Sequence, residues 1–204
     1  ERSEVKYSVT QLAPERNADP INVTETHTNT SVDLNVKADG RFTRTSIEVF
    51  VPKRSNLVIK TDVDLRVEGV TGDIELTGED GAINVRDSGG KLTVASVDGR
   101  IRVIGFKGEL DAQTSDGATM LEGDFEKLTA RSSDGEIIVT LAENASATVR
   151  SRASETVVEG LPALLVSDKD ENREYRIGNG GSPFKITTDG RVVLRSVASL
   201  QDLL

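Results

Sequence analysis

Four acidic side chains stand at a fixed spacing of 18 residues in this sequence, each followed by glycine: Asp80, Asp98, Asp116 and Asp134. If the units that contain them stack in register, the carboxylates form a column with about 4.8 Å between neighbours. Ca²⁺ prefers several carboxylate and carbonyl oxygens, so such a column is a candidate cation site. An Asp beside Gly also bonds its own backbone two residues on, which favours a tight turn. We favour the turn, and we predict no metal and no cofactor.

His27 is the single histidine of the chain, and cysteine is absent. The absence of cysteine excludes disulfides, thiolate catalysis and zinc sites of the Cys type. A hexapeptide-repeat acyltransferase would need an apolar residue at every sixth position and a catalytic histidine inside the repeat. Here apolar pairs recur nine residues apart and His27 lies outside the repeat, so we expect a surface histidine without a catalytic role.

Arginine and glutamate side chains on the outward face of the repeat are the remaining candidates for catalysis. A polysaccharide-cleaving enzyme needs carboxylates, or a set of Arg and Asp, that converge in a groove. We expect Arg86, Arg100 and Arg102 to lie outward, near Glu122 and Glu136. Outward charges are usually a solvated face. We therefore predict that the chain is not an enzyme.

The elements that position these side chains follow from apolar residues on both sides of each Asp-Gly pair. These residues recur at every second position, which is the periodicity of β-strands. A second corner closes each unit, around Gly72, Gly90, Gly108 and Glu126, and its glycines are expected to supply positive φ. Similar units flank the central set, and one inserted residue within 141–145 shifts the frame. The alternating positions of the central units are Ile74, Leu76, Ile83, Val85, Leu92, Val94, Ile101, Val103, Leu110, Ala112, Thr119, Leu121, Leu128, Ala130, Ile137 and Val139.

A fixed short period is typical of stacked units, each too small to bury its own apolar face. We therefore predict an all-β, single-domain β-solenoid (β-helix-like), with about 18 residues per coil, two main strands per coil and capping strands at the ends. A flat antiparallel sandwich is the alternative, although it does not require a period of 18.

The chain is expected to contain four regions. Residues 1–20 form a polar N-terminal arm, and residues 21–54 form N-terminal strands or a cap that includes a turn at Asp39-Gly40. Residues 55–195 hold the repeats, with a charged, Gly-rich excursion near 167–182. Residues 196–204, with Leu200 and Leu203, form a C-terminal tail that is either a short amphipathic helix or frayed.

Outward positions that break the pattern are the candidate interaction surface. The residues four after each Asp are Asn84, Arg102, Met120 and Ile138, and Ile104 lies nearby. Exposed apolar clusters can mark a partner surface. We assign Met120, Ile138, Ile104 and Arg102 to this surface; cover by the Gly-rich excursion or by a terminal arm is the alternative.

Charge and hydropathy limit the partners. The formal net charge is −9, and no stripe of Lys and Arg interleaved with aromatic residues offsets it, which argues against nucleic acid. No apolar run is long enough to span a bilayer. The chain begins at Glu1 without a signal-like segment, so we expect that its targeting segment is missing.

Several segments resemble the bacterial putative-adhesin family of β-strand-repeat proteins, whose function is unassigned. The match covers about residues 45–195, and the chain departs from the family pattern at Asp62-Val63, where glycine is expected. The resemblance implies export to the cell envelope or surface, a role in adhesion or envelope-stress sensing, and no catalytic residues. The segments are IEVFVPKRSNLVIKT at 47–61, GDIELT at 72–77, SDGEI at 133–137 and ITTDGRV at 186–192.

The sequence thus predicts a non-enzymatic, adhesin-like interaction module of the cell envelope or surface. Its expected partner is a protein or glycan of the envelope, and its oligomeric state is left open. Two alternatives remain: the sensing domain of an envelope-stress protein, and a polysaccharide-active β-helix enzyme.

Overall fold

The computed structural model describes residues 4–12, 21–37 and 44–197. The predicted turn at Asp39-Gly40 and the tail residues Leu200 and Leu203 lie outside these ranges. Every element in the described part is a β-strand, so the all-β prediction is confirmed. The chain divides into two compact units, Glu1–Lys53 and Arg54–Leu204, each of which is described by itself.

The first unit contains two antiparallel strand pairs. Strand β1 (Lys6–Leu12) pairs with β4 (Arg44–Phe50), and β2 (Asn22–His27) pairs with β3 (Val32–Lys37). The stretch 1–20, expected to be a polar arm, therefore contains a strand. Apolar side chains of this unit stay partly exposed, with 40% of Val23 and 47% of Val49 accessible.

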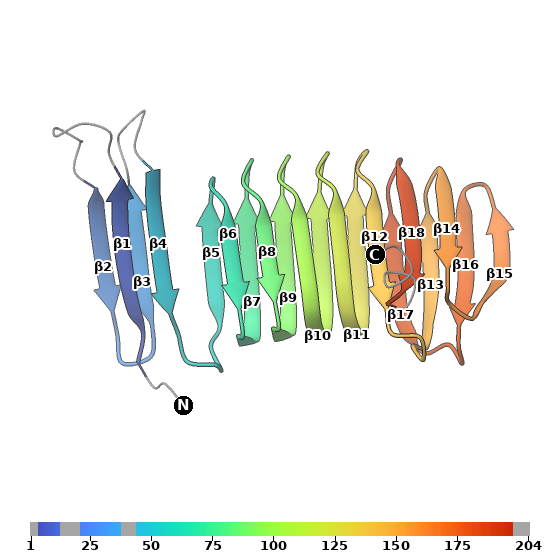
Figure 1. Cartoon of the computed structure of the whole chain (residues 1–204), viewed down its shortest axis with the longest axis horizontal. Helices are drawn as coiled ribbons and strands as arrows, with labels where there is room; N and C mark the ends of the chain where they lie inside the picture. The colour runs from blue at the N-terminus through green and yellow to red at the C-terminus, as the bar shows by residue number, and fades with distance from the viewer. Residues whose placement is uncertain (1–3, 13–20, 38–43, 198–204) are drawn as a thin grey trace. The chain divides into compact units, whose positions relative to one another are not determined.

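The second unit is one 14-stranded sheet that contains parallel and antiparallel pairs (Figure 1). The sheet has two arms, because the long strands β10 and β11 each pair with different neighbours along their two halves. The first arm contains β6 (Leu65–Glu68), β8 (Ile83–Arg86), the beginnings of β10 (Ile101–Thr114) and β11 (Thr119–Ser132), β12 (Ile137–Leu141), β18 (Arg191–Ser196) and β14 (Glu155–Glu159). The second arm contains β5 (Leu57–Thr61), β7 (Thr71–Gly78), β9 (Gly89–Ser96), the ends of β10 and β11, β17 (Ser182–Thr187), β13 (Ala147–Arg152), β16 (Asn172–Ile177) and β15 (Ala163–Lys169).

The 18-residue period sets the register between parallel neighbours. Ile101 lies opposite Ile83 in β8 and opposite Thr119 in β11, and Thr119 lies opposite Ile137 in β12. Because side chains alternate between the two faces of a strand, matching residues of successive repeats lie on the same face. Ile83, Ile101, Thr119 and Ile137 are all buried.

The β-solenoid prediction is wrong. The strands form one large mixed sheet that is not closed into coils. In β10 and β11 the two short strands expected on either side of the second corner are joined into one, whereas β6 and β7, and β8 and β9, stay separate. β10 and β11 each run for 14 residues without a break, with register shifts after Val103 and Gly108 in place of a turn. The glycine-containing corners near Gly90 and Gly108 lie inside strands, because positive φ at these residues bends the strand without ending it.

The order of the strands in space also departs from their order in sequence. β17 lies between β11 and β13, and β18 lies between β12 and β14. After Leu141 the next strands, β13 and β14, do not pair with β11 and β12. The later strands β17 and β18 occupy the positions beside β11 and β12 instead. β16, within the stretch expected to be an excursion, pairs antiparallel with both β13 and β15.

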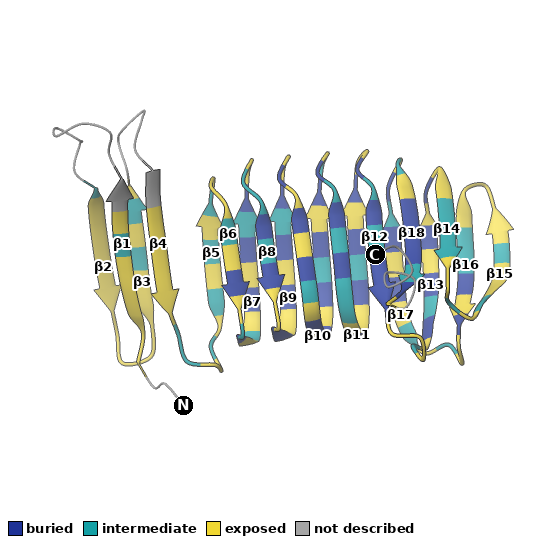
Figure 2. Cartoon of the chain, in the orientation of Figure 1, coloured by how far each residue is buried: buried dark blue, intermediate teal, exposed yellow. Residues whose placement is uncertain are grey.

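The core of the second unit is built from the inward residues of both arms, and Figure 2 shows buried positions alternating with exposed ones along these strands. Val, Ile and Leu dominate it. Three phenylalanines add a buried aromatic row: the ring centroids of Phe106 and Phe125 are 6.5 Å apart, and those of Phe125 and Phe184 are 6.1 Å apart. Aromatic pairs at such separations stabilise a core beyond their buried area.

The Asp-Gly turns are held by close packing of backbone on backbone. A Cβ added at Gly99 would lie 2.2 Å from the carbonyl oxygen of Gly81, and one added at Gly117 would lie 2.2 Å from that of Gly99. Neither Gly99 nor Gly117 is among the glycines with positive φ, whereas the positive φ expected at the second corners is present at Gly90 and Gly108. Glycine is needed at the Asp-Gly turns because no side chain fits between successive turns.

Buried hydroxyl groups beside these turns join each one to the preceding repeat. The Ser132 hydroxyl donates to the carbonyl of Ser115 at 2.9 Å and accepts from the Gly135 amide at 2.9 Å. Ser96 makes the same pair of bonds, to the carbonyl of Glu79 and from the amide of Gly99. The Ser132 hydroxyl thereby satisfies the buried Gly135 amide, and the other bonds add to backbone hydrogen bonds that already join these turns to the preceding repeat.

Candidate functional site

The outward face of the first arm carries the residues that break the repeat. The parallel register places Arg66, Asn84, Arg102, Met120 and Ile138 directly beside one another on β6, β8, β10, β11 and β12. We call this line the outward row. The row exists because each residue stands one position after an inward apolar residue, and successive side chains of a strand point to opposite faces.

The sequence-derived surface residues lie together in this row or next to it. Met120 is the register partner of both Arg102 and Ile138. Ile104 stands two residues after Arg102 on β10, and so on the same face. Met120, Ile138 and Ile104 are half-buried, and Arg102 is exposed. The row therefore changes from cationic to apolar along its length.

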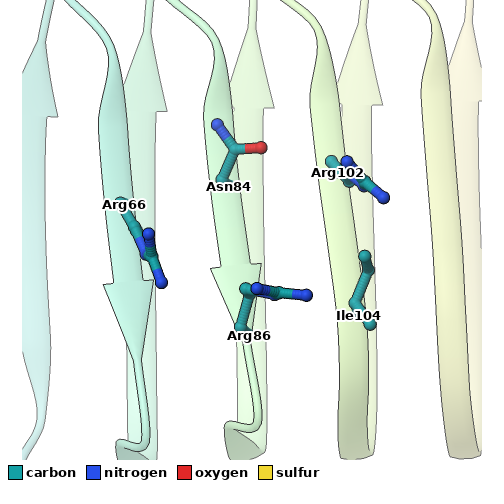
Figure 3. Close-up of a pocket in the computed structure, with 5 residues that line it drawn as sticks. All are labelled: Arg66, Asn84, Arg86, Arg102 and Ile104. Atoms are coloured by element: carbon teal, nitrogen blue, oxygen red, sulfur yellow. The ribbon is translucent and has the colours of Figure 1, made fainter.

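The structure adds a pocket that sequence reasoning did not single out. A shallow hollow of about 280 Å³ is lined by Arg66, Asn84, Arg86, Arg102 and Ile104. Figure 3 shows these side chains on three neighbouring strands, with Arg66 on β6, Asn84 and Arg86 on β8, and Arg102 and Ile104 on β10. The signal was present in the sequence, since Arg66 follows Asp62 by four residues and Arg86 follows Asp80 by six.

The pocket is cationic. The Arg66 guanidinium contacts the Glu68 carboxylate, with Nε 3.1 Å and Nη2 2.5 Å from Oε2. Among the described residues, no carboxylate oxygen lies within 4.0 Å of a guanidinium nitrogen of Arg86 or Arg102. Both side chains are exposed. The pocket therefore offers two guanidinium groups that an external anion can reach.

The glutamates considered for catalysis lie elsewhere on this face. Glu136 pairs with Arg191 at 3.8 Å, and Glu122 is half-buried on β11. Neither glutamate lines the pocket, whose five residues include no carboxylate. Arg100, the residue before β10, is exposed and also lies outside the pocket lining.

The Asp column and His27 are both at the surface. Asp80, Asp98, Asp116 and Asp134 are exposed at the turns. In the described part of the chain, no group of three or more His, Cys, Asp or Glu side chains is placed to hold a metal ion. His27 is exposed on β2, and its Nδ1 lies 3.5 Å from Glu25 Oε1.

Two tyrosines outside the pocket have shifted acidities. Burial raises the pKa of Tyr175 on β16, an effect that nearby Arg173 partly offsets and Asp168 reinforces. On β1, the hydrogen bond from the Tyr7 hydroxyl to Glu25, 2.7 Å long, raises the pKa of Tyr7. Both effects favour the neutral phenol.

The described residues contain no helix that is long and apolar enough to cross a membrane.

Comparisons with known proteins identify no family for this chain. No family model and no curated protein matches the sequence. A solved structure described as a putative cell adhesion protein from Clostridium sporogenes aligns with 96% of this chain and 84% of its own, at 9% identity and a TM-score of 0.36. A likeness this weak carries no argument about fold or function.

Proposed function

We propose that this chain is a non-enzymatic binding module whose outward row contacts another macromolecule of the cell envelope or surface. The observation that carries the proposal is the register of the parallel strands, which gathers Arg66, Asn84, Arg102, Met120 and Ile138 into one continuous line. Residues 18 apart in sequence thereby become neighbours on a shared face. The placement in the envelope rests on the resemblance described above.

The composition of the row suits binding. Arginine and methionine are enriched where proteins meet partners, and a cationic end beside an apolar end supplies charge recognition together with burial. Of the five strands of the row, β8, β10, β11 and β12 are paired on both sides, which holds their side chains at fixed spacing and lowers the entropy lost on association. A broad, shallow surface of this kind fits a macromolecule better than a small substrate, because small-molecule sites are concave and enclosed.

The test is binding of the purified chain to envelope fractions, with a variant in which Met120 and Ile138 are both changed to Ser. We expect a stable fold and clearly weaker binding. The matched control changes Val58 and Val63 to Ser, since these residues are 70% and 62% exposed outside the row. Equal binding by both variants would contradict the proposal, as would cleavage of an envelope glycan by the wild-type chain.

A further inference from the structure

We propose that Arg86 and Arg102 bind the carboxylates of an acidic polysaccharide that lies across strands β6, β8 and β10, and that Arg66 joins them by exchanging its contact with Glu68 for one with the polymer. The inference rests on the proposed function and names the chemical class of its partner. The polymer would run along the outward row, perpendicular to the strands, with Asn84 available to hydrogen-bond sugar hydroxyl groups.

The spacing of the arginines favours a linear polymer. Neighbouring strands of a sheet lie about 4.8 Å apart, so Arg66 and Arg102, two strands apart in the same row, are separated by about 9.6 Å at the backbone. This distance is comparable to the length of two linked sugar rings. Arg86 belongs to the strand between them and stands two residues beyond the row. A uronic acid polymer, with a carboxylate on every ring, therefore meets a cation at about every strand.

The chemistry of the pocket favours carboxylates. Guanidinium groups bind carboxylates through two parallel N–H···O bonds, which gives geometric selectivity as well as attraction. The accessible groups of Arg86 and Arg102 are the ones available for such bonds. The net charge of −9 does not prevent them, because screening confines charge effects to about 8 Å at physiological salt.

The apolar part of the surface favours sugar over nucleic acid. Ile104 lines the pocket and Met120 continues the row, so the C–H face of a sugar ring can lie against aliphatic side chains. Binding of single-stranded nucleic acid relies on aromatic side chains that stack with bases. The residues of the first arm that share this outward face in the described structure include no Phe, Tyr or Trp.

The experiment measures binding of the full chain to oligogalacturonate by calorimetry, with neutral dextran as the uncharged polymer. We expect binding of oligogalacturonate, weakening as salt rises from 50 to 300 mM, and no binding of dextran. Changing Arg86 and Arg102 together to Gln should weaken binding more than tenfold. Arg152→Gln, an exposed arginine on β13 of the second arm, should leave it unchanged.

Three results would overturn the inference: no binding of oligogalacturonate at low salt, equal weakening by the Arg152→Gln control, or tighter arginine-dependent binding of oligothymidylate or of vesicles that contain phosphatidylserine. Failure here is separable from failure of the proposed function. If the chain binds envelope fractions through Met120 and Ile138 but does not bind oligogalacturonate, only the polysaccharide proposal is wrong. If the chain does not bind envelope fractions either, the proposed function is wrong as well.

Discussion

Replacing Gly117 by Ala tests whether close packing of successive turns holds the second unit together. The new Cβ would lie 2.2 Å from the Gly99 carbonyl oxygen and 2.8 Å from its carbon, where ordinary contact begins at 3.4 Å. The turn must therefore move by about 1.2 Å, the shortfall from that contact distance. The obstructing atoms are backbone, which cannot rotate away as a side chain would.

The neighbouring turns leave little room for that movement. A Cβ on Gly99 would be 2.2 Å from the oxygen of Gly81, and one on Gly135 would be 2.4 Å from the oxygen of Gly117. Overpacking of this kind costs about 1–3 kcal/mol and occasionally more, and we expect a value at the upper end, about 3 kcal/mol. Gly→Ala exchange at an unstrained site stabilises the folded protein by about 0.4–1 kcal/mol. Gly117→Ala is therefore expected to change the free energy of unfolding in the opposite direction.

The assay is equilibrium unfolding in urea, followed by circular dichroism. With a slope of about 3 kcal/mol per M, the expected loss lowers the midpoint by about 1 M. The control is Gly69→Ala, because Gly69 has φ of 72° but no atom within 4 Å of the added Cβ. Gly69→Ala should lower the free energy of unfolding only through the left-handed backbone conformation, by about 1–2 kcal/mol. A midpoint for Gly117→Ala at or above that of Gly69→Ala would refute the reasoning.

Three further predictions concern Phe125 in the aromatic row, the buried Ser132 hydroxyl and the raised pKa of Tyr175. Phe125→Ala removes the central ring of the aromatic row and should cost about 3–5 kcal/mol in urea unfolding; a loss below 1 kcal/mol would contradict the role of the row. Ser132→Ala removes the hydroxyl that accepts from the buried Gly135 amide, while the Ser115 carbonyl keeps its bonds from the Ser133 and Asp134 amides, so the change should cost about 1–3 kcal/mol; Ser132→Thr should restore stability because Thr114 occupies the equivalent site. The pKa of Tyr175 is raised in the fold, so the stability it contributes is complete below pH 10 and is lost as pH rises toward the folded pKa. The urea midpoint should therefore fall above pH 10 less steeply in Tyr175→Phe than in the wild type, and identical slopes would disprove the effect.

The candidate site was partly predictable from the sequence. The period of 18 sufficed to place Met120 beside Ile138, because parallel strands joined by equal repeats pair residues at equal positions. The same arithmetic applied to Arg66 and Arg86 would have found the pocket. What it could not supply was the ion pairing, since the contact of Arg66 with Glu68 and the accessibility of Arg86 depend on side-chain positions in three dimensions.

By itself, the sequence determined the strand positions of the central repeats, their inward and outward faces and the register of neighbouring repeats. The strands and their faces follow from the local alternation of apolar and polar residues, and the register follows from the fixed period of 18 residues. The tertiary structure alone decided how the sheet ends and branches. β13 and β17 carry similar alternating patterns, so only packing decided that β17 lies against β11, where Phe184 completes the row with Phe125. It also decided that β10 and β11 continue through their corners as single strands, because buried side chains and paired backbone on both sides keep the chain extended there.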